Sequence, residues 1–407
     1  MRPGVNTAPA APRVRGAITR FALLLTTLGY LLVADAAPRV PQDDREVLER
    51  LPLVIGGALR ELRPLREAVS ADPRNLALAT QLARRYVEIG RTEFDPRYFG
   101  YAEAALDPWF HQDVPPPEVL LLRGLLHQQR HDFDRALADL ATLLRHDPRN
   151  AQAWLIRGGI LQIRGDLPEA LRHCAAVFSQ PQYRFAATTC LCKSLSLDGH
   201  ADQGYSLLRR ALEDAPDAPA AERSWAWTLL AEMAQRRGLP DQAEAHFQSA
   251  LRIGSRDRYL LMSYADFLLD RGQADKVRTL LIEETRADSL LLRLSLAEQA
   301  LGLEPRAHIA LLEARFEASR QRGDSAHRGE EARMRLHLLG QPAEALQLAQ
   351  GNWMTQREPR DARILLESAI AARDPLAAAP VLASMQESGL EDVRLARLAE
   401  AIRALPP

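Results

Sequence analysis

AQAWLIRGGILQIRGDLPEALRHCAAVFSQPQYR, residues 151–184, is one copy of a unit that recurs along the chain every 34 residues. The unit is marked by Trp154, Gly158, Leu161, Gly165 and Ala170. One period earlier the same slots hold Leu120, Gly124, His127, His131 and Ala136, and one period later Gly199 and Gly204 return. A fixed period of this length predicts helix pairs that stack side by side into a solenoid, which offers extended binding surfaces rather than a reaction pocket.

The length and composition of the chain agree with a stack of repeats. The 407 residues exceed the ~250–300 at which a single hydrophobic core stops growing. Apolar residues make up 47% and charged residues 26%, which is typical of a folded, soluble protein and not of a disordered one. The net charge is −1 and no basic cluster stands out, so we do not expect DNA or RNA as the ligand.

The copy at residues 224–257 is the most regular one. Its key positions are Trp227, Leu230, Ala231, Ala234, Gly238, Ala243, Phe247 and Ala250. This pattern resembles the tetratricopeptide repeat, in which W-x2-L-G-x2-Y is followed by A-x3-F and then Pro. Ala231 replaces the first Gly of the pattern, Ala234 replaces Tyr, and Ser255 stands where Pro is usual. The resemblance implies an all-α fold, a right-handed α-solenoid of helix–turn–helix repeats.

The repeat pattern divides the chain into four segments. We expect a leader at 1–36, a degenerate capping repeat at 37–75, regular repeats at 76–287, and irregular repeats with a capping helix at 288–407. Asp-Pro-Arg-Asn occurs at 72–75 and 147–150, which is seven residues more than two periods, so an insertion is expected near 91–100. The closing helix at 391–404 is expected to turn a charged face to solvent, as a terminal cap requires.

The N-terminus has the three-part layout of a secretory signal. Four arginines precede the apolar run at 21–34, and Ala34-Asp35-Ala36 offers a cleavage site between small residues. The apolar run is shorter than the ~20 residues that a transmembrane helix needs. We therefore expect export, to a periplasm; the alternative is an inner-membrane protein anchored by its uncleaved N-terminal segment.

The resemblance also implies where a partner binds. In the tetratricopeptide family, slots 5, 9 and 12 of each first helix line an inner groove that holds a peptide or a helix. These slots and two flanking aromatic residues are here Thr80, Arg84, Leu121, Gln128, Leu155, Gln162, Thr189, Lys193, Ser196, Trp225, Thr228, Glu232, Gln235, Tyr259, Met262 and Asp266. We call them the groove positions. A tail of the same chain folded into this hollow would overturn the assignment.

These features predict a non-catalytic, exported scaffold that binds a protein or peptide of the cell envelope, in the assembly of an envelope complex. The alternative is a receptor subunit for a small molecule or glycan, with Trp225 and Tyr259 as its apolar contact surface. The phosphate loop, the zinc helix and the nucleophile elbow are absent from the sequence. The repeats also leave no segment large enough for a catalytic domain, so we expect neither an enzyme nor a cofactor.

The cysteines and histidines allow two further local predictions. Cys174 lies on the second helix of one unit, and Cys190 and Cys192 lie on the first helix of the next. Cys174 could therefore form a disulfide with either one in an oxidising compartment, or all three could be packing residues. His127 and His131 lie one helical turn apart, but they occupy the slots of the core Tyr and the turn Gly, so we expect no metal site.

Overall fold

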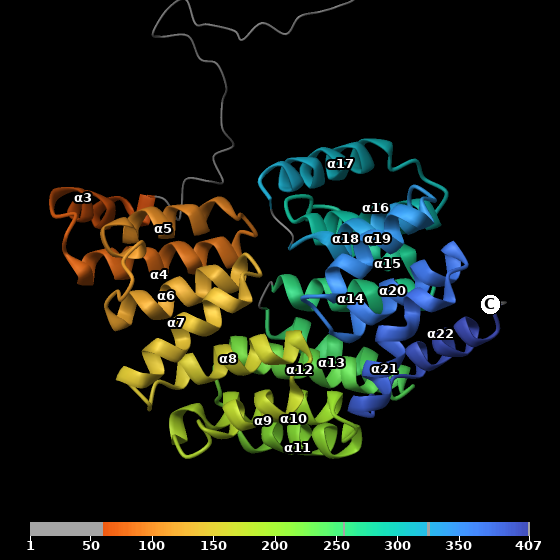
Figure 1. Ribbon diagram of the computed structural model, residues 1–407, viewed down its shortest axis with the longest axis horizontal. Helices are drawn as coiled ribbons and strands as arrows, with labels where there is room; N and C mark the ends of the chain where they lie inside the picture. The colour runs from red at the N-terminus through yellow and green to blue at the C-terminus, as the bar shows by residue number, and fades with distance from the viewer. Residues whose placement is uncertain (1–59, 255–256, 324–325, 406–407) are drawn as a thin grey trace, which may run out of the picture. The chain divides into compact units, whose positions relative to one another are not determined.

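The computed structural model describes residues 60–254, 257–323 and 326–405 (Figure 1). Its helices are α3 (Arg63–Ala71), α4 (Leu76–Thr92), α5 (Arg97–Phe110), α6 (Pro117–Gln129), α7 (Phe133–His146), α8 (Ala151–Arg164), α9 (Leu167–Ala175), η2 (Pro181–Tyr183), α10 (Arg184–Leu197), α11 (Ala201–Asp214), α12 (Ala220–Arg236), α13 (Pro240–Arg252), α14 (Arg258–Asp270), α15 (Ala274–Leu281), α16 (Asp288–Ala300), α17 (Arg306–Gln321), α18 (Arg328–His337), α19 (Pro342–Trp353), α20 (Pro359–Ala372), η3 (Pro375–Ala378), α21 (Ala379–Ser388) and α22 (Val393–Arg403).

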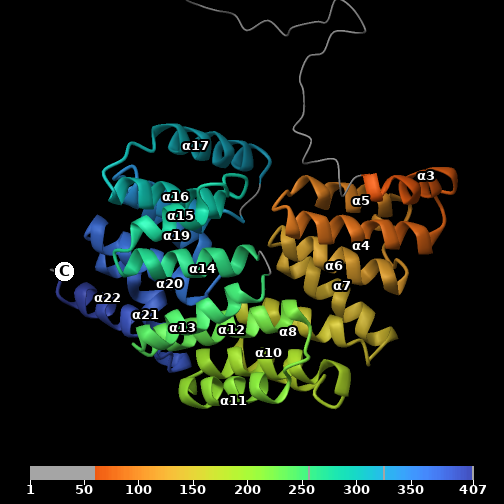
Figure 2. The same cartoon turned by 180° about the vertical axis from the view of Figure 1, so that it is seen from behind.

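The described helices form a row of hairpins. α4 packs on α5, α6 on α7, and the pairing continues in the same way to α18 and α19 (Figure 2). The first helices of successive hairpins also contact one another, from α4 through α20 and on to α22. No strand occurs among the described residues. This arrangement confirms the predicted all-α solenoid.

The leader at 1–36, its apolar run at 21–34 and the first part of the capping repeat lie outside the described residues. Within the described ranges, no helix combines the length and the apolar character needed to span a membrane.

Recurring turn residues give the hairpins their shape. Gly165, Gly199 and Gly238 close the first helices of three hairpins with φ of 77°, 70° and 75°, a left-handed conformation that glycine adopts without steric cost. His131 holds the equivalent slot with φ of 56°. Its position in the sequence is therefore explained by the turn.

The two Asp-Pro-Arg-Asn segments act as helix caps. The Asn75 side chain accepts a hydrogen bond from the backbone of α4, and Asn150 does the same for α8. Each asparagine also donates to the aspartate three residues earlier, at 3.2 Å and 3.1 Å. A capping side chain satisfies an N–H that the first turn of a helix leaves unpaired, so this motif marks where a new hairpin begins.

Small residues allow the helices of one hairpin to approach closely. A Cβ atom placed on Gly204 of α11 would lie 2.7 Å from the Cys192 carbonyl oxygen of α10. A Cβ atom on Gly158 of α8 would lie 3.1 Å from the sulfurs of Cys174 and Cys190. Both glycines fall on repeat slots, so the period reflects a steric requirement.

Much of the segment near 91–100, where the insertion was expected, is helical. α4 continues to Thr92 and α5 starts at Arg97, which confines the irregular backbone to residues 93–96. Tyr98 is buried in the core of the first hairpins, and Phe94 packs against the apolar cluster of the central hairpins. The aromatic side chains of this segment thus serve packing.

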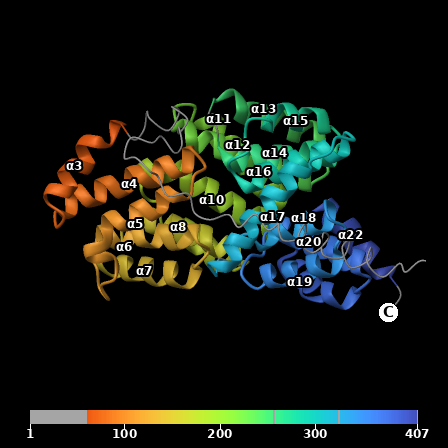
Figure 3. The same cartoon turned by 90° about the horizontal axis from the view of Figure 1, so that it is seen from above.

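The apolar core is divided. One cluster extends from α10 to α18, and another fills the space among α18, α19, α20, η3, α21 and α22. Figure 3 shows the C-terminal helices in blue, folded back beside α14 and α16. The chain therefore returns on itself after α18.

Candidate functional site

All groove positions except Arg84 are buried or half-buried in the structure. Those that are buried are Thr80, Leu121, Gln162, Thr189, Ser196, Thr228 and Met262. Only Arg84 is fully exposed, and the remaining groove positions are half-buried. The structure thus corrects the expectation that all these side chains line an accessible hollow.

Three threonines use their hydroxyl groups within their own helices. Thr80, Thr189 and Thr228 each donate to the carbonyl oxygen four residues earlier, at 2.8, 2.9 and 2.8 Å. Such a bond is the ordinary choice for a hydroxyl on a covered helix face. These side chains were expected to bond a peptide backbone, but here they bond the helix that carries them.

Other polar groove positions bind each other. Gln162 of α8 donates to the Cys190 carbonyl oxygen at 2.9 Å and to the Ser194 hydroxyl at 2.8 Å. Ser196 of α10 accepts from the Arg236 guanidinium at 2.9 Å. These bonds link neighbouring first helices, so their function in the described fold is to hold the stack together.

Glu232 forms the centre of a smaller group. Its two carboxylate oxygens accept hydrogen bonds from the Tyr259 hydroxyl and the Ser263 hydroxyl, both at 2.7 Å. The Arg360 guanidinium lies over the Tyr259 ring, 5.2 Å from its centre. Burial, followed by the charge of Glu232, raises the pKa of Tyr259. The ring predicted to receive a glycan is therefore already stacked against an arginine of the C-terminal repeats.

The N-terminus of α20 closes over α10. The Lys193 ammonium lies 2.9 Å from one Glu358 carboxylate oxygen, and Arg360 lies 2.8 Å from the other. Burial alone would raise the pKa of Glu358, but the charges of Arg360 and Lys193 outweigh it and hold that pKa well below its usual range. Glu358 also accepts from its own helix in a capping box with Asp361. One carboxylate thus caps α20 and fastens it to the groove.

Asp270, at the C-terminal end of α14, makes a second attachment. It pairs with Arg363 of α20 at 2.8 Å and with Arg394 of α22 at 3.3 Å. The Arg357 N–H also donates to the Ile163 carbonyl oxygen of α8 at 2.7 Å. We call these contacts, together with the pair between Lys193 and Glu358, the clasp. The clasp joins residues that lie far apart in the sequence.

The closing helix is part of this attachment. Asp392 is buried and Arg394 faces Asp270, whereas both were predicted on a solvent-facing cap. The physical reason is that the row of hairpins curves back. The charged face of α22 therefore packs against Asp270 of α14 instead of facing solvent.

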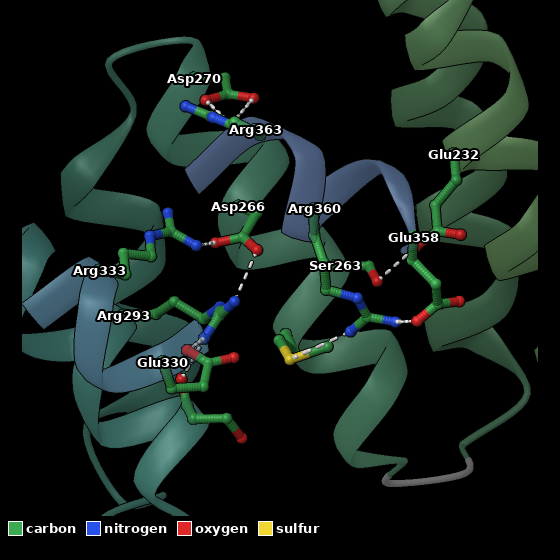
Figure 4. A network of polar contacts seen from close by, with 12 residues as sticks. Glu232, Ser263, Asp266, Asp270, Arg293, Glu330, Arg333, Glu358, Arg360 and Arg363 are labelled. Carbon is green, nitrogen blue, oxygen red and sulfur yellow. Dashed lines mark hydrogen bonds and ion pairs between the residues drawn. The ribbon is translucent and has the colours of Figure 1, made fainter. Parts of the chain in front are cut away.

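Asp266 of α14 connects the clasp to the next hairpins (Figure 4). It pairs with Arg293 of α16 at 2.8 Å and with Arg333 of α18 at 2.6 Å. Arg293 also reaches Glu330 at 2.7 Å and is fully covered. Burial would raise the pKa of Asp266, but the two guanidinium groups hold it well below its ordinary value. A charge in this position is tolerable only because it is paired on two sides.

A cavity of about 90 Å³ remains between the two sides of the clasp. Lys193, Glu232, Tyr259, Asp266, Arg360 and Arg363 are among its lining residues. Pockets for drug-sized ligands measure about 300–1,000 Å³. The cavity beside Tyr259 is therefore smaller than the usual site for a drug-sized ligand.

The groove positions on the N-terminal hairpins have a different setting. Arg84 of α4 is exposed, and Gln128 of α6 and Leu155 of α8 are half-buried. Among the described residues, the side chains of Arg84 and Gln128 make no hydrogen bond or ion pair. None of these three residues takes part in the clasp, although Arg357 bonds the C-terminal end of α8.

Sequence reasoning missed the residues on the far side of the clasp. Glu358 and Arg363 were not singled out, and Arg394 was expected to face solvent. The charged residues on one helix face would have been the only indication. Such a face usually points to solvent, so the pattern could not reveal its partner.

The structure joins Cys174 to Cys190 in a disulfide, with Cα atoms 5.6 Å apart, and leaves Cys192 as a buried thiol. This is one of the two pairings that the sequence left open. Burial raises the pKa of the Cys192 thiol to about 12. Within the described residues, no group of three His, Cys, Asp or Glu side chains is placed to hold a metal ion.

Stacked helix hairpins with a continuous row of first helices define the chain as an α-solenoid repeat protein. Residues 121–183 match the family model described as Tetratricopeptide repeat. Residues 121–183 are therefore similar to tetratricopeptide repeats, and proteins built from such repeats bind protein or peptide partners. No curated protein matches it significantly.

Several solved structures share the arrangement of helices. A tetratricopeptide repeat protein from Parabacteroides merdae is 16% identical, with 64% of this chain and 93% of that one aligned and a TM-score of 0.42. A thermophilic TPR protein in Thermus thermophilus is 22% identical, with 47% and 97% aligned and a TM-score of 0.38. The human IFIT1 dimer with PPP-AAAA is 14% identical, with 86% and 88% aligned and a TM-score of 0.45.

Proposed function

We propose that this chain is an exported, non-catalytic scaffold that docks a protein or peptide segment on the concave face of α4, α6 and α8. One observation carries the proposal: Arg84 and Gln128 keep their polar groups unengaged, while the equivalent positions on α10, α12 and α14 are bonded within the chain. Leu155 adds a half-buried apolar contact to the same face. Side chains that can bond a peptide backbone suit a partner in extended or helical form.

Export is supported by two features. The signal-like layout of residues 1–36 directs the chain out of the cytoplasm, into a periplasm by our proposal. The disulfide between Cys174 and Cys190 is a bond that persists in an oxidising compartment and is rare in the cytosol. Fractionation of the native host, followed by sequencing of the mature N-terminus, tests this part: a cytoplasmic protein that still begins at Met1 would contradict it.

Site-specific photo-crosslinking tests the docking face. A photoreactive amino acid at Arg84 or Gln128 should capture a polypeptide in the native host. The same amino acid at Ala138, which is exposed on the second helix of a hairpin, is the matched control and should capture none. Equal capture from all three positions, or capture from Ala138 alone, would remove the assignment.

A further inference from the structure

The C-terminal repeats have an apolar core of their own. Leu365 and Leu366 of α20 pack with Val381 of α21 and Ile402 of α22, apart from the cluster that fills α10 to α16. Only α18 contributes to both clusters, with Ala332 on one side and Met334 on the other. The core of the C-terminal body therefore meets the central core only at α18, among the described helices.

Many of the contacts that join this body to the concave face involve charged groups. They include the clasp ion pairs, the bond between Arg357 and Ile163, a weak bond of 3.4 Å from the Ala201 N–H to Glu391, and the stacking of Arg360 on the Tyr259 ring. The cavity of about 90 Å³ lies in the same interface. Separation of these surfaces exposes charges, which water solvates well, together with the apolar side chains of Leu197, Leu229 and Ile364 that line the cavity.

The outer edge of the interface depends on backbone contact. A Cβ atom placed on Gly199 would lie 3.3 Å from the Ser388 carbonyl oxygen and 3.6 Å from the Gly389 Cα. Both glycines close helices and have φ of 70° and 63°. Two hairpin turns thus touch without interdigitating side chains, which is a contact that can form and break.

We propose that α19 to α22 form a reversible gate over the concave face of α10, α12 and α14. This inference rests on the proposed scaffold function and extends its docking face from α4, α6 and α8 to α10, α12 and α14. Opening exposes Lys193, Tyr259, Met262 and Asp270. A protein segment that places a carboxylate at Lys193 and a guanidinium at Asp270 then replaces Glu358 and Arg363.

The gate is tested on the full chain by measuring a distance between spin labels. Cysteines replace Gln203 of α11 and Gln386 of α21, which are exposed on the two sides of the interface, while Cys192 is buried and escapes labelling. Arg363→Glu with Arg394→Glu should lengthen the distance by about 10 Å or more, roughly one helix diameter. Adding Asp270→Arg should bring it back toward the wild-type value.

Matched variants keep this test decisive. Arg397→Glu with Arg403→Glu makes the same charge change at exposed positions of the α22 segment and should leave the distance unchanged. Arg363→Gln with Arg394→Gln is the milder opening variant. An unchanged distance in both opening variants, or loss of helicity in both, would overturn the gate.

A peptide of residues 357–372 tests what the opened face accepts. It carries Glu358, Arg360 and Arg363 and should bind the Arg363→Glu/Arg394→Glu protein at least tenfold more tightly than the wild type in fluorescence anisotropy. A peptide with Glu358→Lys and Arg363→Glu should not. Equal binding to closed and opened protein would overturn the proposed exchange. Neither assay uses a native partner. Both can therefore support or overturn the gate even if the crosslinking experiment at Arg84 fails, so the two proposals are tested separately.

Discussion

At the residue scale, Lys193 is the most informative side chain. Removal of one partner from a buried ion pair costs about 3–5 kcal/mol. Arg360 still pairs with Glu358 after the change, so we expect Lys193→Met to lower the free energy of unfolding by about 1–3 kcal/mol. Urea denaturation followed by circular dichroism measures this loss.

The only other lysine provides the control. Lys276→Met removes an exposed ammonium from α15, and surface substitutions of this kind stay within about 0.5 kcal/mol. Equal effects of the two substitutions would mean that the pair between Lys193 and Glu358 adds no stability.

Two glycines in neighbouring hairpins make a second prediction at this scale. Gly204→Ala would place a Cβ atom 2.7 Å from a backbone oxygen, and overpacking of this kind costs about 1–3 kcal/mol. Gly159→Ala in the middle of α8 meets nothing within 4 Å and should gain about 0.5–1 kcal/mol from the better helix propensity. Melting temperatures of the two variants should therefore shift in opposite directions, and a shared direction would contradict the close approach of α10 and α11.

At the scale of the helix, much of the fold could be predicted. The closing helix was expected at 391–404 and runs over Val393–Arg403. Local signals suffice there because the Asp392 side chain caps the first turn of α22, and such caps act within a few residues. The groove positions on these helices were less predictable. A sequence period shows which face of a helix a residue occupies, but not whether a later repeat covers that face.

α20 gives a pH-dependent prediction. Burial would raise the pKa of Glu367, but the hydrogen bond from His337 and the charge of Arg363 outweigh it and lower the pKa to about 2. Since the ordinary value is 4.5, Glu367 adds stability that is complete above pH 4.5 and is lost as the pH falls toward 2. The stability difference between wild type and Glu367→Gln should therefore shrink over that interval in calorimetric melts.

An exposed carboxylate on α22 provides the control for the measurements on Glu367→Gln at different pH values. Glu400→Gln on α22 should give a smaller difference that changes little with pH. A Glu367→Gln difference that stays constant down to pH 2 would show that His337 and Arg363 do not stabilise this carboxylate.

At the scale of the whole molecule, the return of the chain on itself could not be predicted. The contact between Lys193 and Glu358 spans 165 residues, and it depends on the rotation that every intervening repeat adds. No local sequence pattern determines the total rotation between these distant repeats. The same contact changes how stability is distributed, since an open solenoid couples only neighbouring repeats whereas the clasp couples distant ones.

Hydrogen exchange can detect this long-range coupling. Leu365→Ala removes a fully covered side chain from α20 and should cost about 2–5 kcal/mol in the C-terminal core. An open solenoid would lose protection only near α20. Because the clasp ties α20 to α10 and α14, we expect their amides to exchange faster as well. Leu106→Ala, equally buried but in α5, should leave α20 unaffected. If α10 keeps its wild-type protection in Leu365→Ala, the clasp carries no stability from one end of the stack to the other.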